Sequence, residues 1–185
     1  GNYKFSNSGR KDYAVKPPKK TILDSLAENK YNVIALGKMN NIFDGTGINK
    51  SIKAHSNMES INKLTDIMDK NFTGLCMANL CDFDSLYGHT RDVEGYAKAL
   101  EELDVEIPMM LNKLELDDLL IITADHGNDP TFEGCDHTRE NVPVIFYSRG
   151  FNEPKRLPIL NTLADIGATI ADNFDLVKPE IGNSV

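Results

Sequence analysis

The apolar residues of this 185-residue chain follow two different spacings. Apolar positions that recur every three or four residues predict helices at 58–68, from about residue 92 onward and at 163–174. Short apolar runs predict buried strands at 31–36, 72–80, 119–123 and 142–147. Because helices and strands alternate, the chain predicts an α/β fold, with a mostly parallel sheet, βαβ crossovers and helices on both faces.

Local signals refine three parts of this pattern. Residues 21–29 are expected to be helical, with Thr21 and Asp24 resembling the start of a capping box. Pro108 lies inside the long helix and predicts a kink or a break there. Residues 39–57 follow neither spacing and are expected to be a loop.

Composition narrows the class of protein. With 41% hydrophobic residues, the chain predicts one globular domain with its own core. A net charge of −8 argues against nucleic-acid binding and suits a carboxylate-rich pocket that holds cations. No apolar run approaches the roughly 18 residues of a membrane span, so we expect no membrane association. The three cysteines form no CxxC pair, which favours a reducing, cytoplasmic location.

The first 20 residues reverse the sign of the charge, with several Lys and Arg residues against Asp12 alone. One interpretation is a solvated connector that ends at the stiff Pro17-Pro18 pair. The other is an arm that contacts phosphate, since Arg binds phosphate through two hydrogen bonds. The chain opens on Gly1, without Met, and we expect an excised segment or the remnant of a tag.

Histidine and aspartate gather after two of the predicted strands. Asp84 and His89 follow the run 72–80, while Asp125 and His126 follow 119–123, with His137 close behind. Imidazole and carboxylate together are typical ligands of zinc, manganese and similar ions. Solvated loop residues are the alternative for each of them. Cys135, beside Asp136 and His137, is either a metal contact or a spectator thiol.

Lys38 follows the predicted strand 31–36 in a Gly-Lys pair. A glycine at a strand end allows a close approach by a ligand. Lys38 is therefore either on the ligand side of the sheet or an exposed surface lysine.

The motifs DFDSLYGH at 82–89, TADHGNDP at 123–130 and DHTRENVP at 136–143 resemble the alkaline phosphatase superfamily, and within it the phosphopentomutases. The ADHGN core alone is also similar to the cofactor-independent phosphoglycerate mutases. The DFDxLYGH and DHTRE forms favour phosphopentomutase. The resemblance therefore implies an alkaline-phosphatase-like core.

The resemblance also implies a mechanism and a set of site residues. Two divalent ions, usually manganese, flank a phosphothreonine that moves phosphate between the 1 and 5 positions of ribose or deoxyribose, primed by a sugar bisphosphate such as glucose 1,6-bisphosphate. The motifs assign one ion to Asp84, His89 and His137. They assign the other to Asp125 and His126. Lys38 and Arg10 resemble residues that bind the substrate phosphate.

The chain departs from the family in three features. We find no match to the N-terminal strand that supplies another Asp ligand, to the threonine nucleophile, or to the inserted cap domain. We therefore interpret residues 1–20 as a connector returning from a missing cap, and 21–185 as the C-terminal part of the metal-binding core. Its partners would be a pentose phosphate and the missing N-terminal segment, and the chain alone is expected to be inactive. The alternatives are a phosphoglycerate mutase or phosphatase relative, and a non-catalytic metal-binding module.

Overall fold

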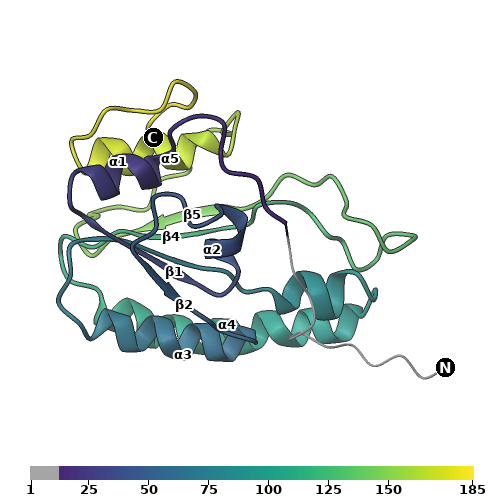
Figure 1. The fold of residues 1–185 in the computed structure, drawn as a ribbon. Coiled ribbons are helices and arrows are strands. Elements are labelled where there is room, and N and C mark those ends of the chain that lie inside the picture. Colours follow the sequence, from purple (N-terminus) through teal and green to yellow (C-terminus); the bar gives the residue numbers. More distant parts are fainter. Residues whose placement is uncertain (1–12) are drawn as a thin grey trace.

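The computed structural model describes residues 13–185, and its strands form a layer between two layers of helices (Figure 1). Helices α1 (Ile22–Glu28) and α5 (Ala164–Asn173) cover one face of the strands. Helices α3 (Asn57–Met68) and α4 (Val93–Lys113) cover the other. The predicted α/β architecture, with helices on both faces, is confirmed.

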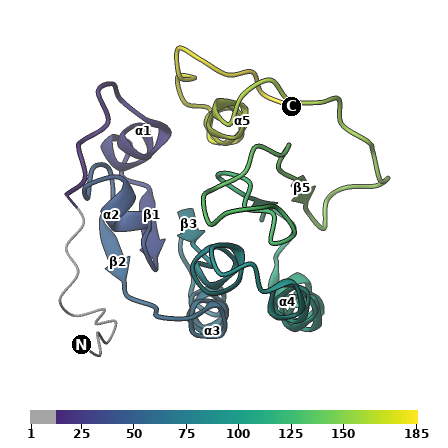
Figure 2. The same ribbon diagram turned by 90° about the vertical axis from the view of Figure 1, so that its right-hand side faces the viewer.

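The centre of the fold is a three-stranded parallel sheet. Strand β1 (Asn32–Leu36) lies between β2 (Lys50–Ile52) and β3 (Gly74–Ala78), with Leu36 opposite Ile52 on one side and Ala78 on the other. Figure 2 shows these strands side by side. The last four residues of β1 are buried, as expected of a central parallel strand covered on both faces. Because the strands are parallel, the carboxyl ends of β1 and β3 lie at the same edge.

The second sheet differs from the predicted topology. Strands β4 (Leu120–Thr123) and β5 (Val144–Tyr147) pair antiparallel, with Ile121 opposite Phe146, and the described strands form two separate sheets. The expected βαβ crossover is wrong for this pair. The segment between the two strands contains turns and no helix, so the chain folds back on itself.

One of the two core clusters forms where α1 and α5 meet the parallel sheet. The predicted capping box starts α1: the Thr21 N–H donates to Asp24 Oδ2 at 2.7 Å, and Thr21 Oγ1 accepts from the Leu23 N–H. Leu23 and Leu26 of α1 are buried in a cluster that also holds Val33 and Ile170. This packing fixes β1, whose end leads toward Lys38.

The structure corrects the prediction for one segment and narrows the prediction for another. The segment 39–57 contains helix α2 (Met39–Ile42) as well as β2, because β2 gains its stability by pairing with β1 and needs little apolar patterning of its own. Helix α4 continues through Pro108 to Lys113, so the helix does not break there, and the alternative of a kink stays a prediction. Among residues 13–185, no helix is long and apolar enough to cross a membrane.

Candidate metal centre

The motif after β3 folds as a π-helix, η2 (Phe83–Gly88), where the sequence suggested a strand end and loop. The His89 N–H donates to the Asp84 carbonyl at 3.0 Å, the i→i+5 bond of a π-turn. In an α-helix, residues five apart are separated by roughly 140° around the axis. The wider π-turn reduces this separation and brings the side chains of Asp84 and His89 toward the same side of η2, so this local fold turns their spacing into a pair of candidate ligands.

Three predicted ligands converge at this point. Asp84 Oδ1 lies 3.4 Å from His89 Nε2 and 3.1 Å from His137 Nε2. One ligand atom from each of the three residues lies within 4.8 Å of the others. His137 comes from the loop between β4 and β5, so distant parts of the chain meet here.

The hydrogen bond at His89 Nδ1 leaves the Nε2 atom available to bind a cation. His89 Nδ1 lies 2.6 Å from the Cys135 carbonyl oxygen, which can only accept a hydrogen bond. Nδ1 therefore carries the proton, and in a neutral ring Nε2 presents a lone pair to the Asp84 carboxylate. A cation between Nε2 and the carboxylate would satisfy both of these acceptors. This donor set therefore fits a divalent metal, with the other nitrogen of His89 held by a backbone carbonyl.

Asp125 and His126 form a looser pair. Asp125 Oδ2 lies 3.8 Å from His126 Nε2, and the Asp125 side chain is 68% exposed. The His126 ring stacks on the His137 ring, with centroids 3.9 Å apart. The pair is thus adjacent to the three-residue cluster through His126, whereas the Asp125 carboxylate lies largely in solvent.

A short bridge explains why the two histidines stack. Gly127 and Thr138 pair antiparallel, and the Thr138 N–H donates to the Gly127 carbonyl at 3.0 Å. Thr138 Oγ1 donates to Glu140 at 2.6 Å and accepts from the Asp129 N–H at the same distance. A Cβ on Gly127 would lie 2.8 Å from the backbone carbonyl oxygen of Thr138, closer than such atoms approach in proteins. Glycine is therefore required at the position that places the two imidazoles together.

The structure separates two aspartates of the same motif. Asp82 Oδ2 accepts from the Asn57 N–H at 2.7 Å, and the Asp82 N–H donates to Asn57 Oδ1 at 2.9 Å. This reciprocal pair ties η2 to the start of α3. Asp82 therefore serves the fold, and Asp84 faces the histidines.

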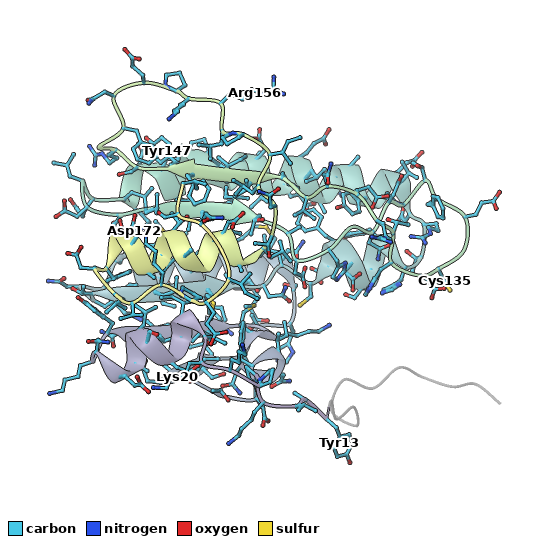
Figure 3. The ribbon with its side chains drawn as sticks, turned by 90° about the horizontal axis from the view of Figure 1, so that it is seen from above. Tyr13, Lys20, Cys135, Tyr147, Arg156 and Asp172 are labelled. Carbon is cyan, nitrogen blue, oxygen red and sulfur yellow. The ribbon has the colours of Figure 1, made fainter. Side chains whose placement is uncertain are left out.

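The other candidate residues from the sequence are Lys38, Cys135 and Arg10. Lys38 is exposed, directly after β1 and before α2. Burial raises the pKa of the neighbouring Cys81 thiol, and the Lys38 charge opposes that shift. Cys135 is exposed on the loop at one end of the molecule, and its carbonyl contacts His89 (Figure 3). Arg10 lies outside the described residues.

Two further residues at the site were not among the predicted ligands. Asn128, inside the ADHGN motif, donates to Asp84 Oδ1 at 2.7 Å. Arg91 adopts a positive φ of 58°, and its side chain joins η2 to the loop after β4. Neither residue type is a typical metal ligand, so only the folded structure identifies them.

Comparisons with known proteins identify the family and the fold of this chain. The model of the metalloenzyme superfamily matches residues 8–178. A solved structure of Leishmania mexicana phosphoglycerate mutase at low cobalt concentration is similar, with a TM-score of 0.66 and 17% sequence identity over 88% of this chain. The chain spans 38% of the length of that mutase. The similarity confirms the predicted alkaline-phosphatase-like core as a fold. Because the family match covers most of its residues, this chain belongs to the metalloenzyme superfamily.

Proposed function

We propose that this chain is the C-terminal core segment of a phosphopentomutase, which exchanges phosphate between the 1 and 5 positions of ribose or deoxyribose. The observation that carries the proposal is the convergence of Asp84, His89 and His137 in a member of the metalloenzyme superfamily. The DFDSLYGH and DHTRE forms of the two motifs that supply these residues favour the phosphopentomutases over related mutases.

The residues present fit two divalent cations, with Mn²⁺ as the expected ion. Asp84, His89 and His137 would hold one ion, and Asp125 and His126 would contribute to the second. Imidazole and carboxylate ligands suit Mn²⁺ and Zn²⁺. When bound, such a pair of ions stabilises the attacking and leaving oxygens of a phosphoryl displacement.

Lys38 would bind the phosphate group of the substrate. In parallel sheets, ligands bind beyond the carboxyl ends of the strands. Lys38 follows β1, and Asp84 follows β3, so both extend from the same edge of the sheet. An exposed ammonium at this edge would form a charge-assisted hydrogen bond to a phosphate. Arg10 would contribute a second such contact.

The remainder of the active site would come from another part of the same protein. The chain spans 38% of the length of the mutase that it resembles in fold. We propose that residues beyond this segment supply the threonine nucleophile and the missing ligands of the second ion. A sugar bisphosphate of the glucose 1,6-bisphosphate type would prime that threonine.

A phosphoglycerate mutase or phosphatase relative is the second candidate, supported by the similarity in fold to the Leishmania mexicana enzyme. The two candidates are separated by supplying the complete protein with Mn²⁺ and glucose 1,6-bisphosphate. We expect conversion of ribose 1-phosphate to ribose 5-phosphate, and its loss in a His137→Ala control. Interconversion of phosphoglycerates without turnover of the pentose phosphate would contradict the proposal.

A further inference from the structure

Arg91 holds together the two segments that carry the metal ligands. Its guanidinium donates to one backbone carbonyl of η2, that of Gly88, at 2.8 Å. It also donates to three backbone carbonyls of the loop after β4: Asp129 at 3.1 Å, Gly134 at 2.6 Å and Asp136 at 2.6 Å. A fifth hydrogen bond, from Nη1 to Asn128 Oδ1 at 2.6 Å, is its contact with a side chain. Arg91 thus links the helix that carries Asp84 to the loop that carries His137.

The chemistry of its neighbours sets the orientation of the Asn128 amide. A guanidinium can only donate, so the atom that faces Arg91 must be the amide oxygen. The amide nitrogen then faces Asp84 Oδ1 at 2.7 Å, and an ionised carboxylate can only accept. Arg91, Asn128 and Asp84 therefore form a one-way series of donors and acceptors. Reversing the amide would break both hydrogen bonds.

The series ends on Asp84 Oδ1, the carboxylate oxygen that faces the proposed metal site. Asp84 Oδ1 accepts from Asn128 and also faces the Nε2 atoms of His89 and His137. The donated hydrogen bond fixes the rotation of the carboxylate before any cation arrives. Hydrogen-bond partners of this kind orient metal ligands and contribute to metal affinity.

Packing leaves the amide no alternative position. Asn128 is buried, with 9% of its surface exposed. A Cβ on Gly88 would lie 2.5 Å from Asn128 Nδ2, so the amide rests directly on the glycine at the end of η2. The π-helix and the amide therefore fit together only while residue 88 has no side chain.

We propose that Arg91 and Asn128 are positioning residues that hold the Asp84 carboxylate in its metal-binding orientation. This inference rests on the proposed metal site at Asp84, His89 and His137. The Asn128 amide suits this role because it accepts from Arg91 through its oxygen and donates to Asp84 through its nitrogen at the same time. Alanine provides neither function, and aspartate cannot donate.

We call the series Arg91–Asn128–Asp84 the relay. Titration of the 185-residue chain with Co²⁺ tests it: calorimetry measures the affinity, and the visible absorption of the bound ion reports its coordination. Changes to the residues that support a metal ligand cost about 10–100-fold in affinity. We expect a loss in this range for Asn128→Ala and Arg91→Lys, with an altered Co²⁺ spectrum. Arg149→Lys is the matched control, because Arg149 donates to the Leu114 carbonyl away from the site. Thermal unfolding of the metal-free variants checks that each one folds, and Asn128→Ala tests the relay independently of the Arg91 change.

The double variant Arg91→Lys/Asn128→Ala distinguishes an Arg91 that acts through Asn128 from an Arg91 that only holds the two segments together. If Arg91 acts through Asn128, Arg91→Lys has a smaller effect on affinity in the Asn128→Ala background than in the parent. Equal fold-changes in both backgrounds, or a normal Co²⁺ affinity and spectrum in Asn128→Ala, would overturn the relay while leaving the metal site intact. A parent chain that binds no Co²⁺ would overturn the proposed site itself, and the relay with it.

Discussion

The two groups of predicted metal ligands differ in how firmly the protein holds them. Asp84 lies in η2, accepts from Asn128, and has a side chain that is 32% exposed. Asp125 lies in a loop after β4 with 68% of its side chain exposed, and His126 Nε2 is 3.8 Å away. His89 is anchored by the Cys135 carbonyl at 2.6 Å, whereas the His126 Nδ1 contact with the Gly127 carbonyl is longer, at 3.2 Å.

The difference lies in the residues around each candidate ligand, which orient metal ligands and contribute to metal affinity. The three-residue cluster has its own supporting hydrogen bonds within this chain. The Asp125–His126 pair has two ligands and little support, so it needs further ligands to hold an ion. We therefore infer that the first cluster binds metal in this chain and that the pair does so only in a more complete site.

The largest expected effect concerns catalysis, which requires both sites. With the second group incomplete, the 185-residue chain should show no turnover of ribose 1-phosphate in saturating Mn²⁺ and glucose 1,6-bisphosphate. Phosphoryl transfer through a covalent intermediate needs a nucleophile held between both ions. Adding the proposed N-terminal segment should restore activity. Robust turnover by the chain alone would show that the pair is already a working site.

A smaller effect, on metal affinity, is expected from a change at Gly88, which supports the first cluster and not the Asp125–His126 pair. Gly88→Ala should weaken metal binding at the first cluster by about tenfold or more, because the added Cβ displaces the Asn128 amide from Asp84. Gly150→Ala is the control, since its Cβ would meet no atom closer than 3.5 Å. Calorimetric titration measures both variants. An unchanged affinity in Gly88→Ala would mean that close packing at η2 does not support the cluster.

A change at Lys38 tests whether substrate binding is independent of the two groups of candidate metal ligands. Loss of a charge-assisted hydrogen bond costs about 1.5–3 kcal/mol, and each 1.4 kcal/mol is roughly tenfold in affinity. Lys38→Ala should therefore raise the KM for ribose 1-phosphate about tenfold or more in the complete enzyme, with metal affinity unchanged. An unaltered KM would identify Lys38 as a surface lysine.

The smallest expected effect on the site comes from Asp165 of α5, which accepts hydrogen bonds from backbone N–H groups on both sides of it in the sequence. The backbone N–H of Asn183, together with those of Thr162 and Asn161, lowers the pKa of Asp165 although burial opposes the shift. A lowered pKa in the folded state stabilises the protein above the unfolded pKa of about 3.9, and this contribution is lost as the pH falls through the folded pKa.

Asp165→Asn should therefore lower the Tm at pH 7, and the difference from the parent should shrink below about pH 4. Metal affinity at pH 7 should not change. Asp66→Asn, at an exposed position of α3, serves as the control. A difference in Tm that stays constant from pH 7 to pH 3 would contradict the role of the Asp165 charge.

Regular patterns in the sequence predicted the parts of the fold that depend on local chemistry. The capping box of Thr21 and Asp24 and the apolar run of β1 identified their elements because each signal lies within a few residues. The antiparallel pairing of β4 and β5 depends on contacts between distant segments. The absence of a helical pattern between the two strands was its main signal in the sequence.

The candidate site shows the same limit. Asp84, His89 and His137 could be proposed from residue type and motif, and the structure brings them together. Arg91 could not, because its role depends on four carbonyls and one amide that meet only after folding. The π-turn that aligns Asp84 with His89 had no periodic signal in a stretch as short as η2.

The assignment of the metal to the Asp84, His89 and His137 cluster is tested most directly by a calorimetric titration of the 185-residue chain with Mn²⁺. It compares the parent with His89→Ala, His137→Ala and Asp125→Ala. We predict that the parent binds one ion, that each histidine variant loses this binding, and that Asp125→Ala retains it. Histidine variants that bind Mn²⁺ as well as the parent, or equal losses in Asp125→Ala, would contradict the assignment of the metal to the Asp84, His89 and His137 cluster.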